Sequence, residues 1–407
     1  MTTCLYLDTA RLGQMCPEAQ QADRDFARLA GEEAGSLYYD LFLRVGFFSL
    51  PPSLRRRYPG LADWSGVASL KTRIKTALAL PRARPLLLAN RAAMLVRLAS
   101  RALCRRCENV LVTDMLWPAY RAILEQECRA QKRTLTTLPL QGPVLNDRIS
   151  QDELVDRVLE RYFGENCDGL LLSALTSRGV RLPIPQIIPA VSRVRRPGFV
   201  VVDAAQAVNH TPLHAAAPYC DFLIAGCHKW LRAYHPLGLG CCCRPTADTV
   251  VAEVSREMTE RGQLDDPLLS FTWELENGRC EAFSETVNLA PLFTAAAAVS
   301  RIWRSPLCRN EAFDRQIANT DRVAEVAHST GWQPVRPAAS LRSGILLLQA
   351  KRSETRSAAP DTLRLAFRRW GLAVSAYVGG LIRTSFLPDT LSPPGLSQVR
   401  SALGRCA

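Results

Sequence analysis

Two apolar segments of the chain each lead into ionisable side chains. Residues 198–202 form a β-branched run that ends at Asp203, and residues 222–226 form a similar run followed by His228 and Lys229. Short apolar runs of this kind predict buried strands. Open α/β sheets build their ligand sites at the carboxyl ends of parallel strands, so we expect these groups to share one site.

An acid and a lysine at this spacing (229 − 203 = 26 residues) suit the chemistry of pyridoxal phosphate. A carboxylate keeps the pyridine nitrogen protonated, so that the ring withdraws electrons, and a desolvated lysine carries the cofactor as a Schiff base. For either residue alone the simpler interpretation is structural: Asp203 would cap a turn and Lys229 would be a solvated loop lysine. The two together favour the cofactor interpretation.

The order of several short motifs strengthens this interpretation. Val-Asp-Ala-Ala-Gln-Ala at 202–207 is followed by Asp-Phe at 221–222, His-Lys-Trp at 228–230 and Pro-Leu-Gly-Leu-Gly at 236–240. This set resembles the class V aminotransferase family, which includes cysteine desulfurases, kynureninases and isopenicillin-N-epimerase-like enzymes. The resemblance implies that Lys229 is the catalytic Schiff-base lysine, that Asp203 pairs with the pyridinium, that Gln206 bonds the ring hydroxyl and that His228 lies near the phosphate.

The same resemblance implies the fold and its division into domains. The fold would be α/β, that of fold-type-I pyridoxal-phosphate-dependent transferases, with a large domain built on a mainly parallel seven-stranded sheet between helices and a small C-terminal α/β domain. Residues 1–20 would be an N-terminal segment near the active site and the small domain, residues 21–300 the large domain and residues 301–407 the small domain.

A turn and three single residues complete the cofactor site that the resemblance implies. The turn at Asn90, Arg91 and Ala92 opens a predicted helix, where free amides can hold a phosphate. Trp117 would stack on the cofactor ring, and Thr176 would reach its hydroxyl side. The alternatives are that Arg91 faces solvent and that Trp117 belongs to the core.

Substrate contacts are implied at both ends of the chain. Arg383 matches the arginine that binds the substrate α-carboxylate in relatives, and a surface strand arginine is its alternative. Thr9, Ala10 and Arg11 match an N-terminal segment that closes over the substrate. Thr286 matches a threonine that reaches the phosphate of a partner subunit, which predicts a homodimer.

Composition and charge exclude other classes of protein. The formal net charge is +13 over 407 residues, but the basic residues are scattered, so we expect no nucleic-acid partner. No apolar run is long enough to span a bilayer and no secretory signal is present, so we expect no membrane partner and a cytoplasmic location. The fourteen cysteines suggest reduced, buried thiols, and the lone Cys-x-x-Cys at 104–107 predicts no metal site.

Strands and helices are predicted to alternate along the chain, as a parallel α/β sheet requires. The predicted strands lie at 85–88, 109–113, 134–138, 169–175, 199–203, 344–348, 373–375 and 381–385, and residues 241–243 are expected to pack in the sheet. The predicted helices lie at 92–103, 118–131, 151–162, 184–194, 289–302, 309–329 and 361–370, with a last helix from 395.

The expected function is that of an enzyme acting at Cα or Cβ of an amino-acid substrate. We expect an aminotransferase or a β-eliminating C–S lyase, with an amino-acid epimerase of the isopenicillin-N type as the alternative. A non-catalytic binding protein that keeps the fold is a further alternative. A persulfide-forming desulfurase is disfavoured, because residues 376–380, the loop before Arg383, contain no cysteine nucleophile.

Overall fold

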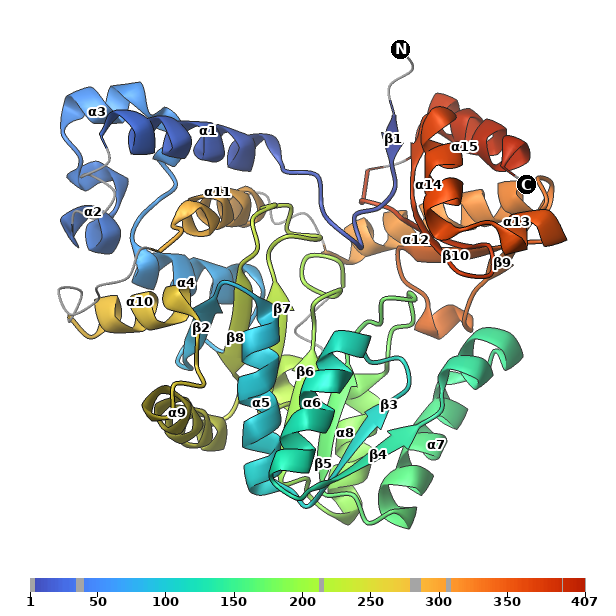
Figure 1. Cartoon of the computed structure of the whole chain (residues 1–407), viewed down its shortest axis with the longest axis horizontal. Coiled ribbons are helices and arrows are strands. Elements are labelled where there is room, and N and C mark those ends of the chain that lie inside the picture. Colours follow the sequence, from blue (N-terminus) through green and yellow to red (C-terminus); the bar gives the residue numbers. More distant parts are fainter. Residues whose placement is uncertain are drawn as a thin grey trace.

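The structure is a computed structural model that describes residues 4–33, 40–211, 216–278, 287–304, 309–389 and 391–406. A seven-stranded sheet lies at its centre, in the order β2-β8-β7-β6-β5-β3-β4 (Figure 1). β8 is antiparallel to both of its neighbours, and every other adjacent pair is parallel, so the mainly parallel sheet is confirmed. The strands are β2 (Leu86–Ala89), β3 (Asn109–Thr113), β4 (Thr134–Leu138), β5 (Gly169–Ser173), β6 (Phe199–Asp203), β7 (Phe222–Gly226) and β8 (Gly238–Cys242).

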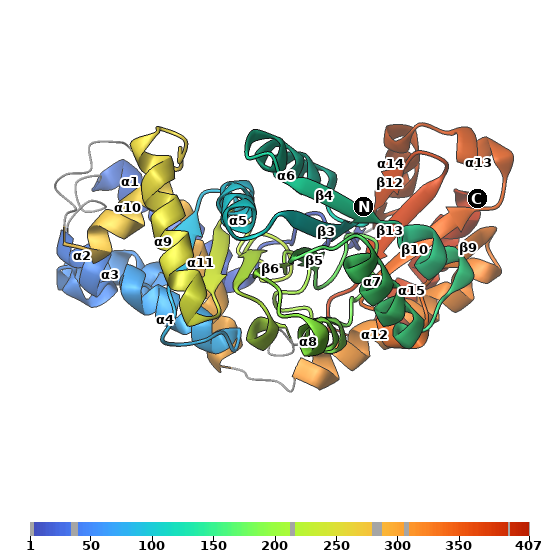
Figure 2. The same cartoon turned by 90° about the horizontal axis from the view of Figure 1, so that it is seen from below.

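The sheet is covered on both faces, and its central strands are apolar except at their polar carboxyl ends. In β6, Val201 belongs to one apolar core, and Val200 and Val202 belong to the other, as alternation along a strand requires. The first core contains α5 (Ala92–Arg106), α6 (Pro118–Ala130) and α9 (Pro245–Glu260). The second contains α4 (Val67–Ala77), α7 (Gln151–Gly164), α8 (Ile184–Val194) and α11 (Ala290–Arg304), and Figure 2 shows the two layers on opposite sides of the sheet.

Short helices surround the second core at one end of the sheet. The aromatic rings of Phe42, Trp64 and Phe293 pack against one another there, with centroids 4.9 to 6.5 Å apart. These contacts join the N-terminal helices to α11. The helices are α1 (Pro17–Glu32), α2 (Asp40–Val45), α3 (Pro52–Arg57) and α10 (Pro267–Glu276), together with short 3-10 turns.

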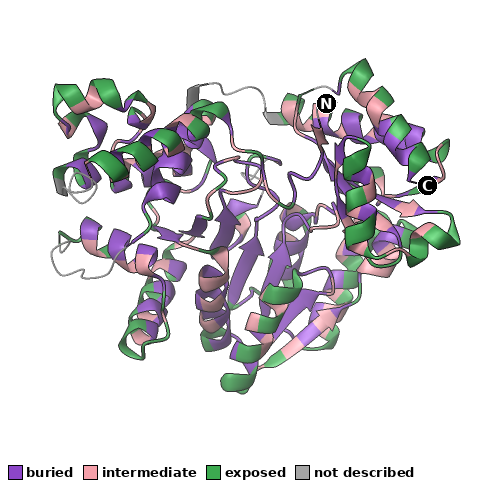
Figure 3. Ribbon diagram, turned by 45° about the horizontal axis from the view of Figure 1, so that its top comes forward, coloured by how far each residue is buried: buried purple, intermediate pink, exposed green. Residues whose placement is uncertain are grey.

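A four-stranded antiparallel sheet forms the C-terminal part of the chain, in the order β12-β13-β10-β9. Its buried strands pack on helices and form a third apolar core (Figure 3). β1 (Leu5–Tyr6) lies parallel to β11 (Leu372–Ala373), so the start of the chain joins this part. The remaining elements are α12 (Arg309–His328), β9 (Trp332–Val335), β10 (Ile345–Ala350), α13 (Ser353–Ser357), α14 (Pro360–Arg369), β12 (Ser375–Tyr377), β13 (Leu381–Ser385) and α15 (Pro393–Arg405).

Several predicted elements differ from those observed by one to three residues at their ends, and two of the differences have a clear physical reason. The single strand expected at 373–375 is divided at Val374 into β11 and β12, which belong to different sheets. The last helix begins at Pro393 rather than Gly395, since proline is well tolerated in a first helical turn and Ser392 caps it. No helix in the described part of the chain is long and apolar enough to cross a membrane.

Candidate active site

Eight of the residues predicted from the sequence line one cavity of about 510 Å³. The cavity lies at the carboxyl ends of the central parallel strands and is bounded by the N-terminal segment and the C-terminal sheet. The residues brought together in this way are Ala10, Arg11, Trp117, Asp203, Gln206, His228, Lys229 and Arg383.

Asp203 is the last residue of β6 and is buried. Its Oδ1 accepts a hydrogen bond from the amide of Ala205 at 2.9 Å, and the Ser173 hydroxyl donates to its Oδ2 at 3.4 Å. Burial raises the pKa of Asp203, while the Ala205 amide, the charge of Lys229 and the Ser173 hydroxyl act against that rise. The carboxylate is thus held in place by the end of its own strand and by the neighbouring strand.

Lys229 follows β7 and is partly buried in the wall of the cavity. Burial lowers the pKa of its amine, Asp203 raises it and Arg383 lowers it further. Within the described residues the Lys229 amine has no hydrogen bond or ion pair. A lowered pKa makes the neutral form of this amine easier to reach, and in that form it can react with a carbonyl carbon or accept a proton.

The N-terminal segment packs closely against the backbone of His228 and Lys229. The amide of Gly13 donates to the carbonyl of His228 at 2.8 Å. A β-carbon at position 13 would lie 1.9 Å from the Lys229 carbonyl oxygen, so only glycine fits there. The chain therefore closes one side of the cavity directly beside the lysine.

His228 and Gln206 line the same cavity as the reactive pair Asp203 and Lys229. Burial lowers the pKa of His228 to about 4, so its ring is neutral near pH 7. The Gln206 amide nitrogen donates to the Ala10 carbonyl at 2.7 Å, and its oxygen accepts from Trp230 Nε1 at 2.8 Å. Gln206 therefore joins the N-terminal segment to the loop that carries Lys229, and one of its amide hydrogens remains for a ligand.

His210 fixes this loop to the C-terminal part of the chain. Its ring stacks on Trp230 with centroids 3.6 Å apart, and its Nδ1 donates to the Gln206 carbonyl at 2.9 Å. Its Nε2 accepts from the amide of Gly344 at 3.0 Å. Burial lowers the pKa of His210 to about 3, and these two bonds suit the neutral ring.

Arg383 lies in β13 and is buried, so it is not a surface strand arginine. Its Nη1 donates to the Ser177 carbonyl at 3.1 Å and its Nη2 to the Ser375 hydroxyl at 3.2 Å. The Asp8 carboxylate lies 3.5 Å from Nη2. Its Nε is buried with no hydrogen-bond partner in the described part of the chain, so part of the guanidinium remains available for a carboxylate.

Trp117 and Tyr120 also line the cavity. Trp117 precedes α6 and is 46% exposed, so it is not a core tryptophan. Burial raises the pKa of Tyr120, and the charge of Asp203 adds to this effect. The indole is therefore placed where a flat ligand in the cavity could stack on it, and this role stays a prediction.

The predicted phosphate turn does not line the cavity. Asn90 and Ala92 stand on either side of Arg91, the residue before α5. Both carboxylate oxygens of Asp266 accept from the Asn90 amide, at 3.0 and 2.9 Å, and the same carboxylate caps α10 through the Leu269 amide. The amides within α5 at Ala92 remain for a phosphate, whereas that of Asn90 already has an acid partner.

Two further predicted residues, Thr9 and Thr176, do not line the cavity. Thr9 is buried beside Ala10, and Thr176 is buried with its hydroxyl accepting from the Val180 amide at 3.2 Å. Thr286 lies outside the described residues.

Sequence reasoning missed several residues that face or border the cavity. The cavity is also lined by Tyr120, Arg364, Ser375 and Tyr377. Asp8 borders it through its contact with Arg383. Asp8 and Tyr120 lie close to predicted site residues in the sequence, because Asp8 precedes Thr9 and Tyr120 follows Trp117 by three positions. Arg364 carries no local signal, because an arginine on an amphipathic helix normally faces solvent.

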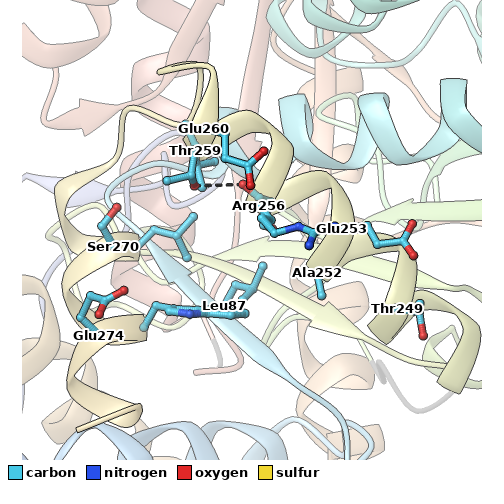
Figure 4. A pocket seen from close by; sticks show the side chains of 13 residues that line it. Leu87, Thr249, Ala252, Glu253, Arg256, Thr259, Glu260, Ser270 and Glu274 are labelled. Atoms are coloured by element: carbon cyan, nitrogen blue, oxygen red, sulfur yellow. Dashed lines mark hydrogen bonds between the residues drawn. The ribbon is translucent and has the colours of Figure 1, made fainter. Parts of the chain in front are cut away.

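A larger cavity of about 780 Å³ lies between α9 and α10 (Figure 4). Leu87, Leu269 and Trp273 contribute apolar surface to it, and Figure 4 shows the acidic side chains of Glu260 and Glu274 around it. None of the predicted site residues lines this cavity, so the chemistry belongs to the smaller one.

Comparison with known proteins agrees with this assignment. Residues 95–264 match the family described as aminotransferase class-V. No curated protein matched the chain in a sequence comparison. The fold is similar to that of a cysteine desulfurase from Escherichia coli, with 15% identity, a TM-score of 0.70 and coverage of 99% of this chain and 94% of that one.

Two other solved structures are similar over nearly their whole length. A cystine C–S lyase in complex with cysteine persulfide has 12% identity, a TM-score of 0.67 and coverage of 99% and 98%. In another structure of that lyase, glycine is covalently linked to the pyridoxal-phosphate cofactor. A pyridoxamine-pyruvate aminotransferase from Mesorhizobium loti has 14% identity, a TM-score of 0.66 and coverage of 100% and 92%.

The expected resemblance to the aminotransferase class-V family is confirmed over residues 95–264. The fold-type-I architecture is confirmed, and the family match agrees with the expected class of enzyme and its expected pyridoxal-phosphate cofactor. The described residues fit this cofactor, because an amine without a hydrogen-bond partner and a buried carboxylate line the same cavity.

Proposed function

We propose that the protein is an aminotransferase or a β-eliminating lyase that acts on an α-amino acid. The observation that supports this most directly is that Lys229, Asp203 and Arg383 line one cavity. Joined to a lysine amine through its aldehyde, pyridoxal phosphate supplies an electron sink for bonds at the substrate Cα. Lys229 is the amine and Asp203 the acid that this cofactor needs.

Each of the three residues has a separate task. Arg383 binds the α-carboxylate and so fixes which bond at Cα faces the reactive groups. Lys229, whose pKa is lowered by burial, takes a proton from Cα and returns it to a neighbouring atom. The buried negative charge of Asp203 favours protonation of the pyridine nitrogen of the cofactor.

The surroundings of the cavity support direct transfer or elimination rather than a persulfide. β12 and β13 are joined by a three-residue turn, Val378 to Gly380, so no long loop reaches into the cavity before Arg383. None of the described cysteines lines the cavity. A sulfur acceptor of the desulfurase kind is therefore missing from the described residues, and a leaving group would go directly to solvent.

The lysine assignment is tested with Lys229→Ala and a matched control, Lys351→Ala, an exposed lysine of the C-terminal part. We expect the first variant to lose the visible absorbance of the lysine-bound cofactor and nearly all turnover, by about 10³-fold or more. The control should keep both. An unchanged spectrum with full activity in Lys229→Ala would refute the proposal.

Product analysis separates the reactions. A transaminase converts one equivalent of amino acid and then needs a keto-acid acceptor, whereas a β-lyase releases ammonia and a keto acid continuously without one. An inverted amino acid would identify the alternative, an epimerase. No spectral response to any amino acid would identify a non-catalytic protein.

We also propose a homodimer as the active unit and the cytoplasm as its compartment. The homodimer rests on the family resemblance of Thr286, and sedimentation at working concentration tests it. The twelve described cysteines are all free thiols, which suits a reducing compartment.

A further inference from the structure

The side chains that line the cavity carry more positive charge than is needed to bind the α-carboxylate of a substrate. The charged side chains that line the cavity are those of Arg11, Asp203, Lys229, Arg364 and Arg383, and only one of these five is acidic. Lys229 and Asp203 are assigned to the cofactor, and Arg383 is assigned to the α-carboxylate. Two guanidinium groups, those of Arg11 and Arg364, therefore have no task in the proposed reaction.

Arg11 is fixed at its backbone and free at its side chain. Its amide donates to the Asp8 carbonyl at 2.9 Å, and the preceding residue, Ala10, bonds Ser385 through its amide and Gln206 through its carbonyl. Its guanidinium is exposed and makes no hydrogen bond or ion pair with the residues that the structure describes. Because its backbone is fixed and its guanidinium has no acidic partner among the described residues, Arg11 presents an unneutralised positive charge to the cavity.

Arg364 approaches the same cavity from α14, which packs against β12. Its partner is Asp361, one turn earlier on the helix, and the Asp361 side chain is 78% exposed. An exposed ion pair of this kind contributes little free energy, so a ligand anion can replace Asp361 as the partner. Arg364 and Arg11 come from separate segments, and the cavity is where both can meet one ligand.

We propose that the substrate carries a second anionic group, and that Arg11 and Arg364 bind it while Arg383 binds the α-carboxylate. The substrate class is therefore an amino acid with a carboxylate or a phosphate on its side chain. Both groups accept hydrogen bonds from guanidinium forks in the same geometry, so the arginines alone do not separate them. This inference rests on the proposed function and adds the substrate class to it.

The experiment measures binding to the holoenzyme by the change in cofactor absorbance, together with KM and kcat where turnover occurs. L-aspartate, L-glutamate and O-phospho-L-serine are compared with the neutral L-asparagine, L-glutamine and L-serine. We expect at least one anionic amino acid to bind about tenfold or more tightly than its neutral counterpart, the size expected for a charge-assisted hydrogen bond. Comparing L-aspartate and L-glutamate with O-phospho-L-serine shows whether the second anionic group is a carboxylate or a phosphate.

Variants assign the effect to the two arginines. Arg364→Gln and Arg11→Gln should each weaken the anionic amino acid about tenfold and its neutral counterpart about twofold or less. Arg368→Gln removes the same charge from an exposed position of the same helix and should change neither. Equal affinity for anionic and neutral amino acids, or equal losses in the variants, would overturn the inference. A protein that responds to no amino acid would instead overturn the proposed function.

Discussion

The carboxylate of Asp8 and the guanidinium of Arg383 lie 3.5 Å apart, from Oδ1 to Nη2, and both side chains are buried. The Ser375 hydroxyl donates to the same carboxylate oxygen at 2.6 Å and accepts from Arg383. The arginine that is expected to bind the substrate is therefore already in contact with an acid of its own chain. Two carboxylates at one guanidinium repel each other, so we expect Asp8 to lower the affinity of Arg383 for a carboxylate ligand.

Asp8→Asn should lower KM for the amino-acid substrate about threefold to tenfold, because the oxygen that Ser375 bonds is kept while the competing charge is removed. Burial raises the pKa of Asp8, against the opposing effects of Ser375, Arg383 and Arg11. The affinity of the natural protein should therefore improve as pH falls through that pKa, where Asp8 becomes neutral. Titration of KM against pH checks this, and Asp8→Asn should lack that step.

The control is Asp314→Asn, which removes an exposed acid from α12 and should keep the natural pH profile. If KM rises in Asp8→Asn and its pH profile is unchanged, Asp8 only positions Arg383 and its charge does not compete.

Gly13→Ala should destabilise the protein by about 1–3 kcal/mol, because the added methyl group would meet the Lys229 carbonyl oxygen and force the N-terminal segment away. The exposed Arg11 should then become more accessible to trypsin. Denaturant unfolding and the rate of cleavage after Arg11 check both effects. Gly31→Ala is the matched control, since a methyl group there meets open space and lies in α1, where alanine is favoured by up to about 1 kcal/mol.

His210 should make the folded state sensitive to acid. Its pKa is about 3 in the folded protein, below the ordinary 6.5, so the unfolded chain binds the additional proton between these values. Its contribution to stability is complete above pH 6.5 and is lost as pH falls towards 3. Between pH 7 and 5 the loss should be about 2 kcal/mol.

His210→Gln should remove this part of the pH dependence in chemical unfolding. His328→Gln, an exposed change, should retain it. Identical slopes of unfolding free energy against pH in the natural protein and in His210→Gln would contradict the assignment.

Much of the central fold follows from local sequence, because the buried strands are continuous apolar runs and the helices between them are amphipathic. β3, β4 and β6 have the predicted bounds, since charged or turn residues limit each run. The division at Val374 could not be predicted, because β11 and β12 pair with different sheets and only tertiary contacts separate them.

In the site, too, residues within local sequence motifs could be predicted, whereas contacts between distant parts of the chain could not. Asp203 and Lys229 could be found because each follows a recognisable strand in an ordered motif. The contact of Asp8 with Arg383 joins positions 375 residues apart (383 − 8), and no local pattern reports it. Asp266 was missed for the same reason, since its position at Asn90 depends on how α10 packs beside β2.

The start of the chain is attached both to the C-terminal part and to the central part of the protein. Leu5 and Leu7 are hydrogen-bonded to the C-terminal part, whereas Gly13 and Cys16 are hydrogen-bonded to the loop that carries Lys229. The few residues in between form a short tether that lines the cavity, and in it Ala10 is bonded to Ser385 of the C-terminal part and to Gln206 of the central part. Arg11 follows Ala10 on this tether. Any rotation of the C-terminal part towards the central sheet must slacken or stretch this tether, so opening and closing would move a positive charge in step with Arg383.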